Sequence, residues 1–229
     1  MRKLMRELLH ISFLASICVN FRTLPFYQAV KFPILIARHV KIDGRLSKNA
    51  IKLNGRIKPG RVLFGFGGSA NLSYTCTRRS YLCIRGSGQI IFEGTARFSP
   101  RFTLIAKDAT MTIGSGFDCN NGSMLICNCG MSFGENCMLG RDVEVRDSDG
   151  HIILEKSGDR EVEKNNKKYV RLGNHVWICS GVTILKGVEI GDNCVVAHSS
   201  VCTKPFSGEG LLIGGYPAKV IRENISWKK

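Results

Sequence analysis

An apolar or small residue returns at every sixth position between Leu172 and Cys202. One series consists of Leu172, Ile178, Ile184, Ile190, Val196 and Cys202, and a second consists of Val176, Val182, Val188, Cys194 and Ser200. An amphipathic helix repeats its apolar face about every 3.6 residues, and a half-buried strand repeats it every second residue. The six-residue period fits neither, and it predicts short strands separated by turns.

A repeat of this length predicts a solenoid. Each unit forms one short strand and a turn, three units close one triangular coil, and the stacked coils form a parallel β-helix around an apolar column. Small residues that follow the apolar ones, such as Gly173, Gly191 and Ala197, suit the turns. The alternative is a chance run of Val, Ile and Gly in a β-sandwich, and five consecutive units in one register argue against it.

Weaker six-residue series precede this segment. They consist of Ile51, Ile57 and Leu63, then Ile84, Ile90, Ala96 and Phe102, and then Phe133, Leu139 and Val145, accompanied by Cys137 and Val143. Residues 69–80 are out of phase, and we expect a corner loop or an irregular coil there. The sequence therefore predicts one β-helix domain over 36–215, preceded by a helical or cap segment over 1–35 and followed by a tail over 216–229.

The charge of the chain is strongly positive. Its 33 Lys plus Arg residues exceed its 18 Asp plus Glu residues, which gives a formal net charge of +15. Such an excess implies an anionic partner: a phosphorylated cofactor, an acidic saccharide, a lipid-diphosphate carrier, an anionic membrane or nucleic acid. Nucleic acid is the weakest of these, because the sequence shows no helix-turn-helix, zinc finger or basic-aromatic sheet motif.

The ten cysteines do not follow the pattern of a disulfide scaffold or a zinc site. Cys137, Cys194 and Cys202 occupy apolar positions of the repeat, where a free thiol acts as a small buried hydrophobe. Cys127 and Cys129 are one residue apart, and no second pair with zinc-finger spacing follows. We therefore expect reduced thiols, no bound metal and a cytoplasmic location.

The N-terminal segment has a different composition. Residues 8–19, LLHISFLASICV, are mostly apolar, but the run is short for a bilayer span and no signal-peptidase site follows it. We expect a short helix that packs on the end of the solenoid. Cations flank the run at Arg2, Lys3, Arg6, Arg22 and Lys31. A second interpretation is therefore peripheral contact with the inner face of an anionic membrane.

Residues 146–170 interrupt the repeat. This stretch is mostly charged and polar, so its side chains cannot face an apolar column, and it must leave the coil as an excursion. Loops inserted on a rigid scaffold often carry function. The excursion contains His151, preceded by Asp147, Ser148, Asp149 and Gly150. The sequence therefore predicts an active-site loop over 146–170.

Three stretches carry a resemblance to a known family. They are DSDGH at 147–151, GNHVWICSGVTILKGVEIGDNCVV at 173–196 and GGYPAKVIRENISW at 214–227. They resemble the hexapeptide-repeat acyltransferases, and within them the maltose and galactoside acetyltransferase-like group with its capsular and O-antigen polysaccharide O-acetyltransferases. Residues 20–36 resemble the lead-in of those polysaccharide enzymes. The resemblance implies a left-handed β-helix, a homotrimer, and acetyl-CoA bound between neighbouring subunits.

The activity that the resemblance implies is transfer of an acetyl group from acetyl-CoA to a saccharide hydroxyl in capsule, O-antigen or exopolysaccharide biosynthesis. His151 stands at the position of the family's catalytic histidine, and a neutral imidazole titrates in the range that a general base needs. Asp149 is the second catalytic candidate, because an aspartate close in sequence, Asp147 or Asp149, could orient the imidazole. The alternative for Asp149 is a loop-stabilising role.

The acetyl-CoA contacts that the resemblance implies follow the matched coil edge. They are Trp177, Ser180, Gly181, Ala197, His198, Ser199, Thr203, Lys204, Lys219 and Arg222, the last two for phosphates. Two positions depart from the family pattern, Cys179 in place of Gly and His198 within the GAGS-like turn. Cys179 opens a covalent route through an acyl-thiolate, which a position beside the core column disfavours.

Three other functions remain open from the sequence. The nearest is N-acetylation of an amino sugar or its nucleotide derivative. A zinc carbonic anhydrase on a β-helix requires three clustered histidines, whereas none of the five histidines here forms an H-x-x-x-x-H pair. The third is a non-catalytic trimeric scaffold. The acceptor itself, whether a free sugar, a nucleotide sugar or a lipid-linked repeat, is not specified by any motif.

Overall fold

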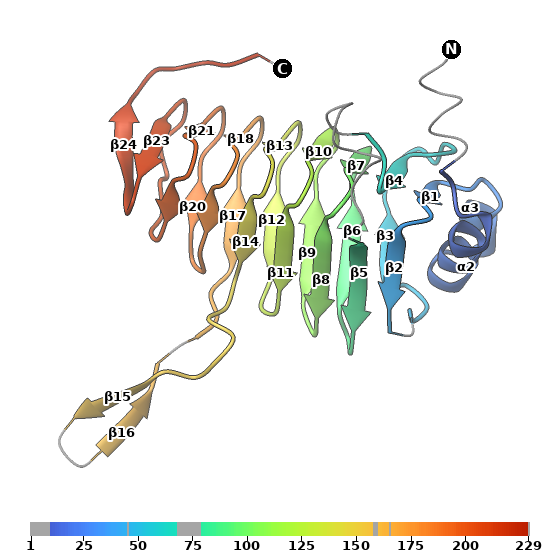
Figure 1. Ribbon diagram of the computed structural model, residues 1–229, viewed down its shortest axis with the longest axis horizontal. Helices are drawn as coiled ribbons and strands as arrows, with labels where there is room; N and C mark the ends of the chain where they lie inside the picture. Colours follow the sequence, from blue (N-terminus) through green and yellow to red (C-terminus); the bar gives the residue numbers. More distant parts are fainter. Residues whose placement is uncertain (1–9, 45, 68–78, 158–159, 165, 229) are drawn as a thin grey trace.

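The computed structural model describes residues 10–44, 46–67, 79–157, 160–164 and 166–228, and these residues form a parallel β-helix (Figure 1). Three sheets run along the sides of the coil, and successive strands of the chain go to successive sheets. Outside the excursion and the last strand, each strand pairs in parallel with the strand one coil away. Leu104, for example, pairs with Leu82 on one side and with Leu125 on the other. The β-helix predicted from the repeat is confirmed.

The strands divide among the three sheets as follows. The nine-stranded sheet contains β1 (Ile34–Ile36), β4 (Val62–Phe64), β7 (Ala96–Phe98), β10 (Phe117–Cys119), β13 (Met138–Leu139), β18 (Trp177–Ile178), β21 (Val195–Val196), β23 (Leu212–Gly215) and β24 (Ala218–Arg222). The seven-stranded sheet contains β2 (Val40–Asp43), β5 (Ser80–Arg85), β8 (Thr103–Lys107), β11 (Met124–Cys127), β14 (Glu144–Arg146), β19 (Thr183–Ile184) and β22 (Val201–Cys202). The six-stranded sheet contains β3 (Ile51–Leu53), β6 (Gln89–Phe92), β9 (Thr110–Ile113), β12 (Met131–Phe133), β17 (Val170–Leu172) and β20 (Glu189–Ile190).

The core is the apolar column inside the coils. Every member of the two strict series between Leu172 and Cys202 is buried, as the repeat predicts. Phenylalanine rings fill the N-terminal half of the column. Phe98 lies at its centre, with ring centroids 5.0 Å from Phe64, 5.5 Å from Phe102 and 5.6 Å from Phe117. Such ring contacts add to the free energy gained by burying the apolar area.

The weaker six-residue series also predict the buried residues correctly, except in the second coil. All members of these series from Ile84 to Val145 are buried, and so is Ile51. Leu63 was expected to face the column, but it is only partly buried and faces outward, while Val62 and Phe64 point inward. Ile57 lies outside the strands. The connection between β3 and β4 is longer than in a regular unit, which shifts the phase by one residue. Most of the expected irregular region 69–80 lies outside the described residues.

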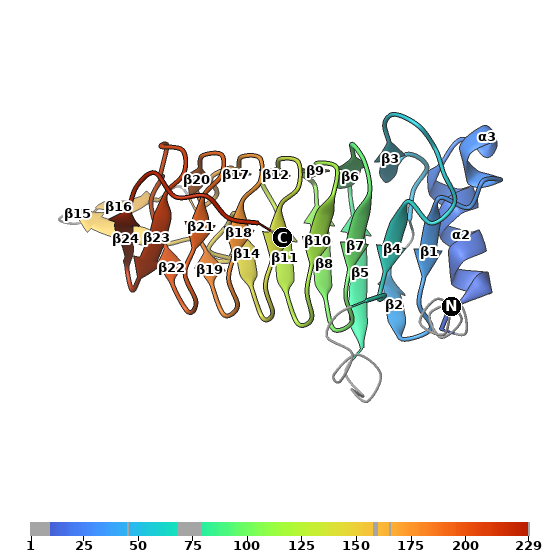
Figure 2. The same cartoon turned by 90° about the horizontal axis from the view of Figure 1, so that it is seen from above.

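Two helices cover the N-terminal end of the coil. α2 (Phe13–Thr23) and α3 (Phe26–Ala29) lie beside β1, within the segment expected to form a cap (Figure 1, Figure 2). Ser12 caps α2, because its side chain accepts a hydrogen bond from the backbone N–H of Ala15. In the described part of the chain, no helix combines the length and the apolar character that crossing a membrane requires.

The predicted excursion leaves the coil after β14 and returns at β17. It starts at the corner between the seven-stranded and the six-stranded sheets and projects away from the coils (Figure 1). Its outer part is an antiparallel hairpin of β15 (Leu154–Ser157) and β16 (Arg160–Glu163). The sequence analysis predicted that a loop leaves the coil here, but it did not predict the two strands within that loop.

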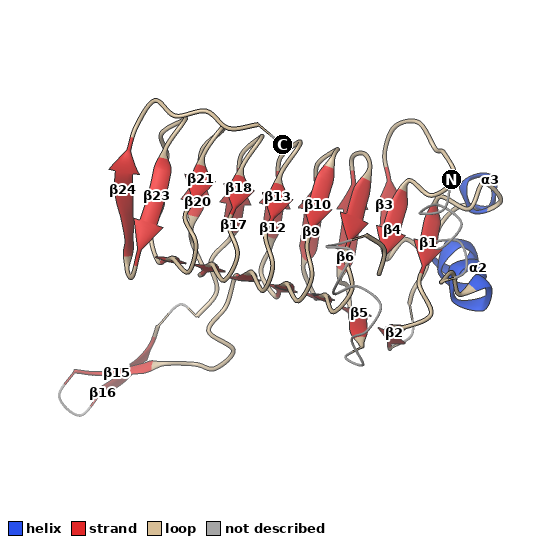
Figure 3. Ribbon diagram, turned by 45° about the horizontal axis from the view of Figure 1, so that its top comes forward, coloured by secondary structure: helices blue, strands red, loops and turns tan. Residues whose placement is uncertain are grey.

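The C-terminal end is closed by a reversal of direction. β24 pairs antiparallel with β23, and the last residues then run back along the outside of the coils (Figure 3). β24 lies within residues 216–229, which were expected to be a tail. The division of the chain into cap, β-helix and tail remains a prediction.

The packing of the phenylalanine column can be tested by substituting Phe98 with Ala. The fully buried ring contacts Phe64, Phe102 and Phe117, so its loss leaves a cavity, and we expect a destabilisation of about 3–5 kcal/mol. Urea unfolding followed by circular dichroism measures this change. Thr112→Ala is the control, since Thr112 faces outward on β9 and should change stability by less than about 0.5 kcal/mol. An equal effect of both substitutions would contradict the assigned column.

Candidate functional site

The excursion joins the coil through a short two-chain neck. Ser148 and Lys167 form an antiparallel bridge, the N–H of Asp149 donates to the carbonyl of Asn166 at 2.9 Å, and the N–H of Lys168 donates to the carbonyl of Asp147 at 2.9 Å. The neck therefore has a defined geometry. His151 follows it directly and stands at the base of the projecting arm.

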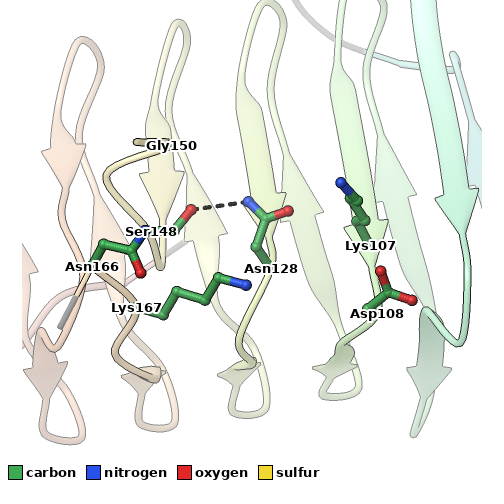
Figure 4. A pocket seen from close by; sticks show the side chains of 7 residues that line it. All are labelled: Lys107, Asp108, Asn128, Ser148, Gly150, Asn166 and Lys167. Atoms are coloured by element: carbon green, nitrogen blue, oxygen red, sulfur yellow. Dashed lines mark hydrogen bonds between the residues drawn. The ribbon is translucent and has the colours of Figure 1, made fainter. Parts of the chain in front are cut away.

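Asp147 anchors the neck to the coil below it. Its carboxylate is fully buried and accepts hydrogen bonds from the backbone N–H groups of Asn128, Cys129 and Gly130, at 2.7 to 3.0 Å. The side-chain amide of Asn128 also donates to the hydroxyl of Ser148 at 2.9 Å (Figure 4). A buried carboxylate needs such donors. Asp147 is thus held by the turn 128–130, which leaves Asp149 as the aspartate considered for orienting His151.

Asp149 has a cationic partner. Its carboxylate forms an ion pair with the ammonium group of Lys186, and both side chains are partly buried. Lys186 follows β19, on the same corner of the coil as the excursion. This contact supports the loop-stabilising alternative for Asp149. A role of Asp149 in orienting the imidazole remains a prediction.

His151 is exposed, and its backbone carbonyl accepts a hydrogen bond from the side-chain amide of Asn166 at 3.4 Å. The residue before it, Gly150, lines a small polar hollow at the base of the excursion (Figure 4). Lys107, Asp108, Asn128, Ser148, Asn166 and Lys167 also line this hollow. Two lysines and one aspartate, Asp108, give the lining of this hollow a net positive charge, and the sequence analysis had not selected any of the three.

A second group of predicted site residues lies on a different corner. Ser180, Gly181, His198 and Ser199 occupy turns between the nine-stranded and the seven-stranded sheets. The turns stack directly, because the N–H of Ser199 donates to the carbonyl of Ser180 at 3.0 Å and the N–H of Gly181 donates to the carbonyl of Arg141 at 2.8 Å. Gly181 has a φ of +69°, a region in which glycine is favoured. His198 and Ser199 are exposed, so this edge is open to a ligand.

Trp177 lies on β18, facing outward, and is partly buried by the C-terminal segment. The Trp227 ring lies 5.7 Å from Trp177 and stacks on the His175 imidazole at 4.1 Å. The indole N–H of Trp227 donates to the carbonyl of His175 at 2.8 Å. The sequence analysis missed Trp227, although it lies inside the matched stretch 214–227. Trp227 lies outside the six-residue series, so the periodicity could not predict that its ring packs on the coil.

The remaining predicted site residues are spread over the C-terminal coils. Ala197 is partly buried on the edge that carries Ser180, and Thr203 and Lys204 are exposed after β22, on the corner of the excursion. Lys219 and Arg222 are exposed on β24. Within one chain, the structure therefore groups Ser180, Gly181, Ala197, His198 and Ser199 on one corner and leaves His151 on another.

Burial controls the chemistry of the cysteines. The nine cysteines in the described residues are free thiols. Burial raises the pKa of Cys179, and it raises the pKa of Cys119 and of Cys202 to about 12. A thiol with a raised pKa carries little thiolate at neutral pH, and the thiolate is the nucleophile. This direction argues against the covalent route through Cys179.

Metal-ligand types do not gather in the described residues. No three His, Cys, Asp or Glu side chains among them lie in an arrangement that could hold a metal ion. His151 and His198 are on different corners, and His175 is stacked on Trp227. A zinc assay on the purified protein remains the direct test of the carbonic anhydrase alternative.

Comparison with known proteins bears on the C-terminal coils. Residues 169–204, which contain strands β17 to β22, match the model of the bacterial transferase hexapeptide (six repeats) family. These residues are a hexapeptide-repeat segment of the β-helix. The resemblance noted in the sequence analysis is thereby confirmed.

Two curated relatives that this chain resembles are acetyltransferases. The polysialic acid O-acetyltransferase of Neisseria meningitidis is 39% identical over 122 residues, which are 53% of this chain and 56% of the relative. The galactoside O-acetyltransferase of Escherichia coli K12 is 32% identical over 114 residues, which are 48% of this chain and 53% of the relative. The matched region thus spans little more than half the length of either relative.

A solved structure supports the fold over a longer stretch. The polySia-specific acetyltransferase NeuO superposes with a TM-score of 0.56 and 22% sequence identity, covering 83% of this chain and 72% of that one. At this identity the likeness concerns the fold. The fold comparison therefore extends beyond the coils that the family model matches.

The anchoring role of Asp147 can be tested with Asp147→Asn. The amide keeps the size of the side chain, but it removes the negative charge and puts an NH₂ donor where one oxygen accepted from a backbone N–H, so we expect a loss of about 1–3 kcal/mol of stability. Urea unfolding measures it. Asp142→Asn is the matched control, because Asp142 is mostly exposed and its 3.6 Å ion pair with Arg101 should contribute less than about 1 kcal/mol. If Asp147→Asn proves no more harmful than the control, the anchor is wrongly assigned.

Proposed function

We propose that this protein transfers an acetyl group from acetyl-CoA to a hydroxyl of a saccharide, with His151 as the general base. The observation that carries the proposal is the exposed His151 at the base of a polar excursion, which Asp147 anchors to the turn 128–130, one coil before the residues 169–204 that match bacterial transferase repeats. The two curated relatives support the reaction, because both are named as O-acetyltransferases of saccharides. We place it in the assembly of a surface polysaccharide.

The imidazole of His151 supplies the chemistry that such a transfer requires. Its neutral form takes the proton of the acceptor hydroxyl while the oxygen attacks the thioester carbonyl carbon. The tetrahedral intermediate collapses, the carbon–sulfur bond breaks, and the imidazolium returns the proton to the leaving thiolate. Backbone N–H groups near the transferred carbonyl would stabilise the oxyanion. Lys107 and Lys167, in the hollow beside Gly150, add positive charge where an anionic acceptor would approach (Figure 4).

The open corner of Ser180, Gly181, His198 and Ser199 supports an acetyl-CoA site. Its turns stack directly, with Ser199 and His198 as the nearest side chains to Gly181, and an extended pantetheine chain would lie along them and bond with backbone groups. Lys219 and Arg222 are exposed cations on β24, near the end of the same nine-stranded sheet, and suit the phosphates. Trp177, Ala197, Thr203 and Lys204 complete the proposed contacts.

The separation of the two corners supports a homotrimer. His151 and the Ser180 corner lie on different edges of one coil, so a site that contains both requires a second copy. We propose that acetyl-CoA binds between neighbouring protomers and that the β-helix winds to the left, as the resemblance implies. Closed cyclic symmetry makes every such interface equivalent. The cytoplasmic location remains a prediction.

Substitution of His151 by Ala tests the proposed base. We expect acetyl transfer to fall by about 10²–10⁴-fold, with acetyl-CoA binding retained, because a general base contributes a factor of this size. Labelled acetyl-CoA and a panel of saccharides measure transfer, and calorimetry measures binding. His10→Ala is the matched control, since His10 lies in the N-terminal segment and should leave the rate unchanged. A His151→Ala protein that turns over at the wild-type rate would refute the mechanism and favour a scaffold.

The same assay separates O-acetylation from N-acetylation. Hydroxylamine cleaves an ester and leaves an amide intact, so an O-acetylated product loses its label. A product that keeps the label would identify the protein as an N-acetyltransferase and would overturn the proposed acceptor group.

Mixing two inactive variants tests whether the site is shared. His151→Ala removes the base, and His198→Trp obstructs the other corner with a bulky side chain. If each site takes His151 from one protomer and the His198 corner from the next, randomly mixed trimers regain about a quarter of the wild-type activity. A site formed within one chain never contains both intact residues, so no activity would return. Separately purified, unmixed variants are the control.

A further inference from the structure

The helix α2 packs with its polar side toward the protein. Ser16, Asn20 and Thr23 are buried against the coil, together with Val19. The Asn20 side chain donates to the carbonyl of Ile34 at 2.8 Å and accepts from the Ile34 N–H at 3.2 Å. The Ser16 hydroxyl accepts from the Ile36 N–H at 3.0 Å. These side chains satisfy backbone groups on the open edge of β1 that would otherwise lack partners.

The apolar side of the same helix is therefore turned to solvent. Phe13, Leu14, Ile17 and Phe21 are spaced for one helical face, and all four are exposed. Phe13 is 69% exposed and Leu14 is 83% exposed. An isolated exposed leucine is ordinary, but a whole exposed apolar face is not. It indicates a surface that is covered by a partner.

The apolar face continues onto α3 and the residues after it. Phe26, Tyr27, Val30 and Phe32 are also exposed, with Phe26 at 75%. The ring of Phe21 lies 6.0 Å from Phe26 and 6.1 Å from Phe32, so the two groups form one continuous surface. We call these eight residues the cap surface. It lies at the N-terminal end of the coil, opposite β24 (Figure 1, Figure 2).

The charged residues in the sequence around the cap surface are all positive. No Asp or Glu occurs between residues 8 and 42 of the sequence, whereas Arg22, Lys31, Arg38 and Lys41 fall within that stretch. All four of these cations are exposed. Asp43 is the only acidic residue between residues 8 and 92 of the sequence, so the excess of positive charge includes the cap surface and continues into the first coils. An apolar surface whose own stretch of sequence carries cations and no carboxylates complements an interface that presents negative charge outside apolar chains.

We propose that the cap surface docks on a membrane that contains anionic lipids. Aromatic and aliphatic side chains enter the boundary between headgroups and acyl chains, and the lysine and arginine side chains meet the lipid phosphates. α2 has 11 residues and lies on the membrane rather than across it. In the homotrimer proposed above, three cap surfaces bind together, and avidity strengthens a weak single contact. A lipid-linked acceptor would then meet the enzyme at the same surface.

Flotation with lipid vesicles tests the docking. We expect the full-length protein to float with vesicles of phosphatidylcholine and phosphatidylglycerol and not with phosphatidylcholine alone, and added salt should weaken the binding. The variant Phe13→Gln/Leu14→Gln/Phe26→Gln should reduce the bound fraction by about tenfold or more. These side chains are the most exposed of the cap surface, so circular dichroism should show an unchanged fold. Arg22→Gln/Lys31→Gln should lower both the binding and its salt dependence.

A matched control comes from the opposite end of the coil. Tyr216→Gln/Ile221→Gln also replaces large exposed apolar side chains, at 83% and 60% exposure, and should bind vesicles as the wild type does. The proposal is overturned if the wild type does not float with anionic vesicles, or if the triple variant floats equally well. Size-exclusion chromatography gives a further outcome that overturns it. If the wild type forms an assembly larger than the trimer and the triple variant does not, the cap surface binds a second copy of the protein and not a membrane. Acetyl transfer to a water-soluble saccharide should be unchanged in the triple variant, which separates docking from catalysis.

Discussion

Parallel pairing between equivalent strands of successive coils is the constraint on which the structure depends. Pairs such as Leu82 with Leu104 and Leu104 with Leu125 hold each inward residue above another inward residue, so the column stays continuous. A charged stretch cannot enter that column without an unpaired buried charge. Residues 147–168 therefore leave at a corner, and the neck at Ser148 and Lys167 returns the chain in register for β17. The rigidity of the coil is what gives the exposed His151 a defined position.

A parallel β-helix also leaves an open strand edge at each end, and the two ends are closed differently. At the C-terminal end the chain reverses, and β24 pairs antiparallel with β23. At the N-terminal end the described residues add no strand beyond an isolated antiparallel bridge between Ile11 and Ala37. The side chains of Ser16 and Asn20 supply the missing hydrogen bonds to β1, and this requires the polar face of α2 to point inward. The exposed apolar face is thus a direct consequence of how the edge of β1 is satisfied.

The sequence predicted the fold best where the repeat is strict. Between Leu172 and Cys202 every inward residue was identified, because units of equal length keep one phase. The prediction for Leu63 was wrong, since the longer connection before β4 shifts the phase and periodicity alone does not register an insertion. The orientation of α2 could not be predicted either. A helix normally buries its apolar face, and only the geometry of the β1 edge shows that Asn20 is needed there.

The sequence named the residues of the candidate site, and those residues remain a prediction, but it could not give their contacts. The sequence placed Asp147 and Asp149 equally near His151, because proximity along the chain cannot distinguish a buried carboxylate from one at the rim. The structure separates them: Asp147 bonds to three backbone N–H groups of the coil below, and Asp149 pairs with Lys186. Both contacts hold the base of the excursion and leave the His151 side chain exposed. In the trimer proposed above, an exposed imidazole on a fixed neck would complete a site on the neighbouring protomer, and the Ser180 corner would supply the other half.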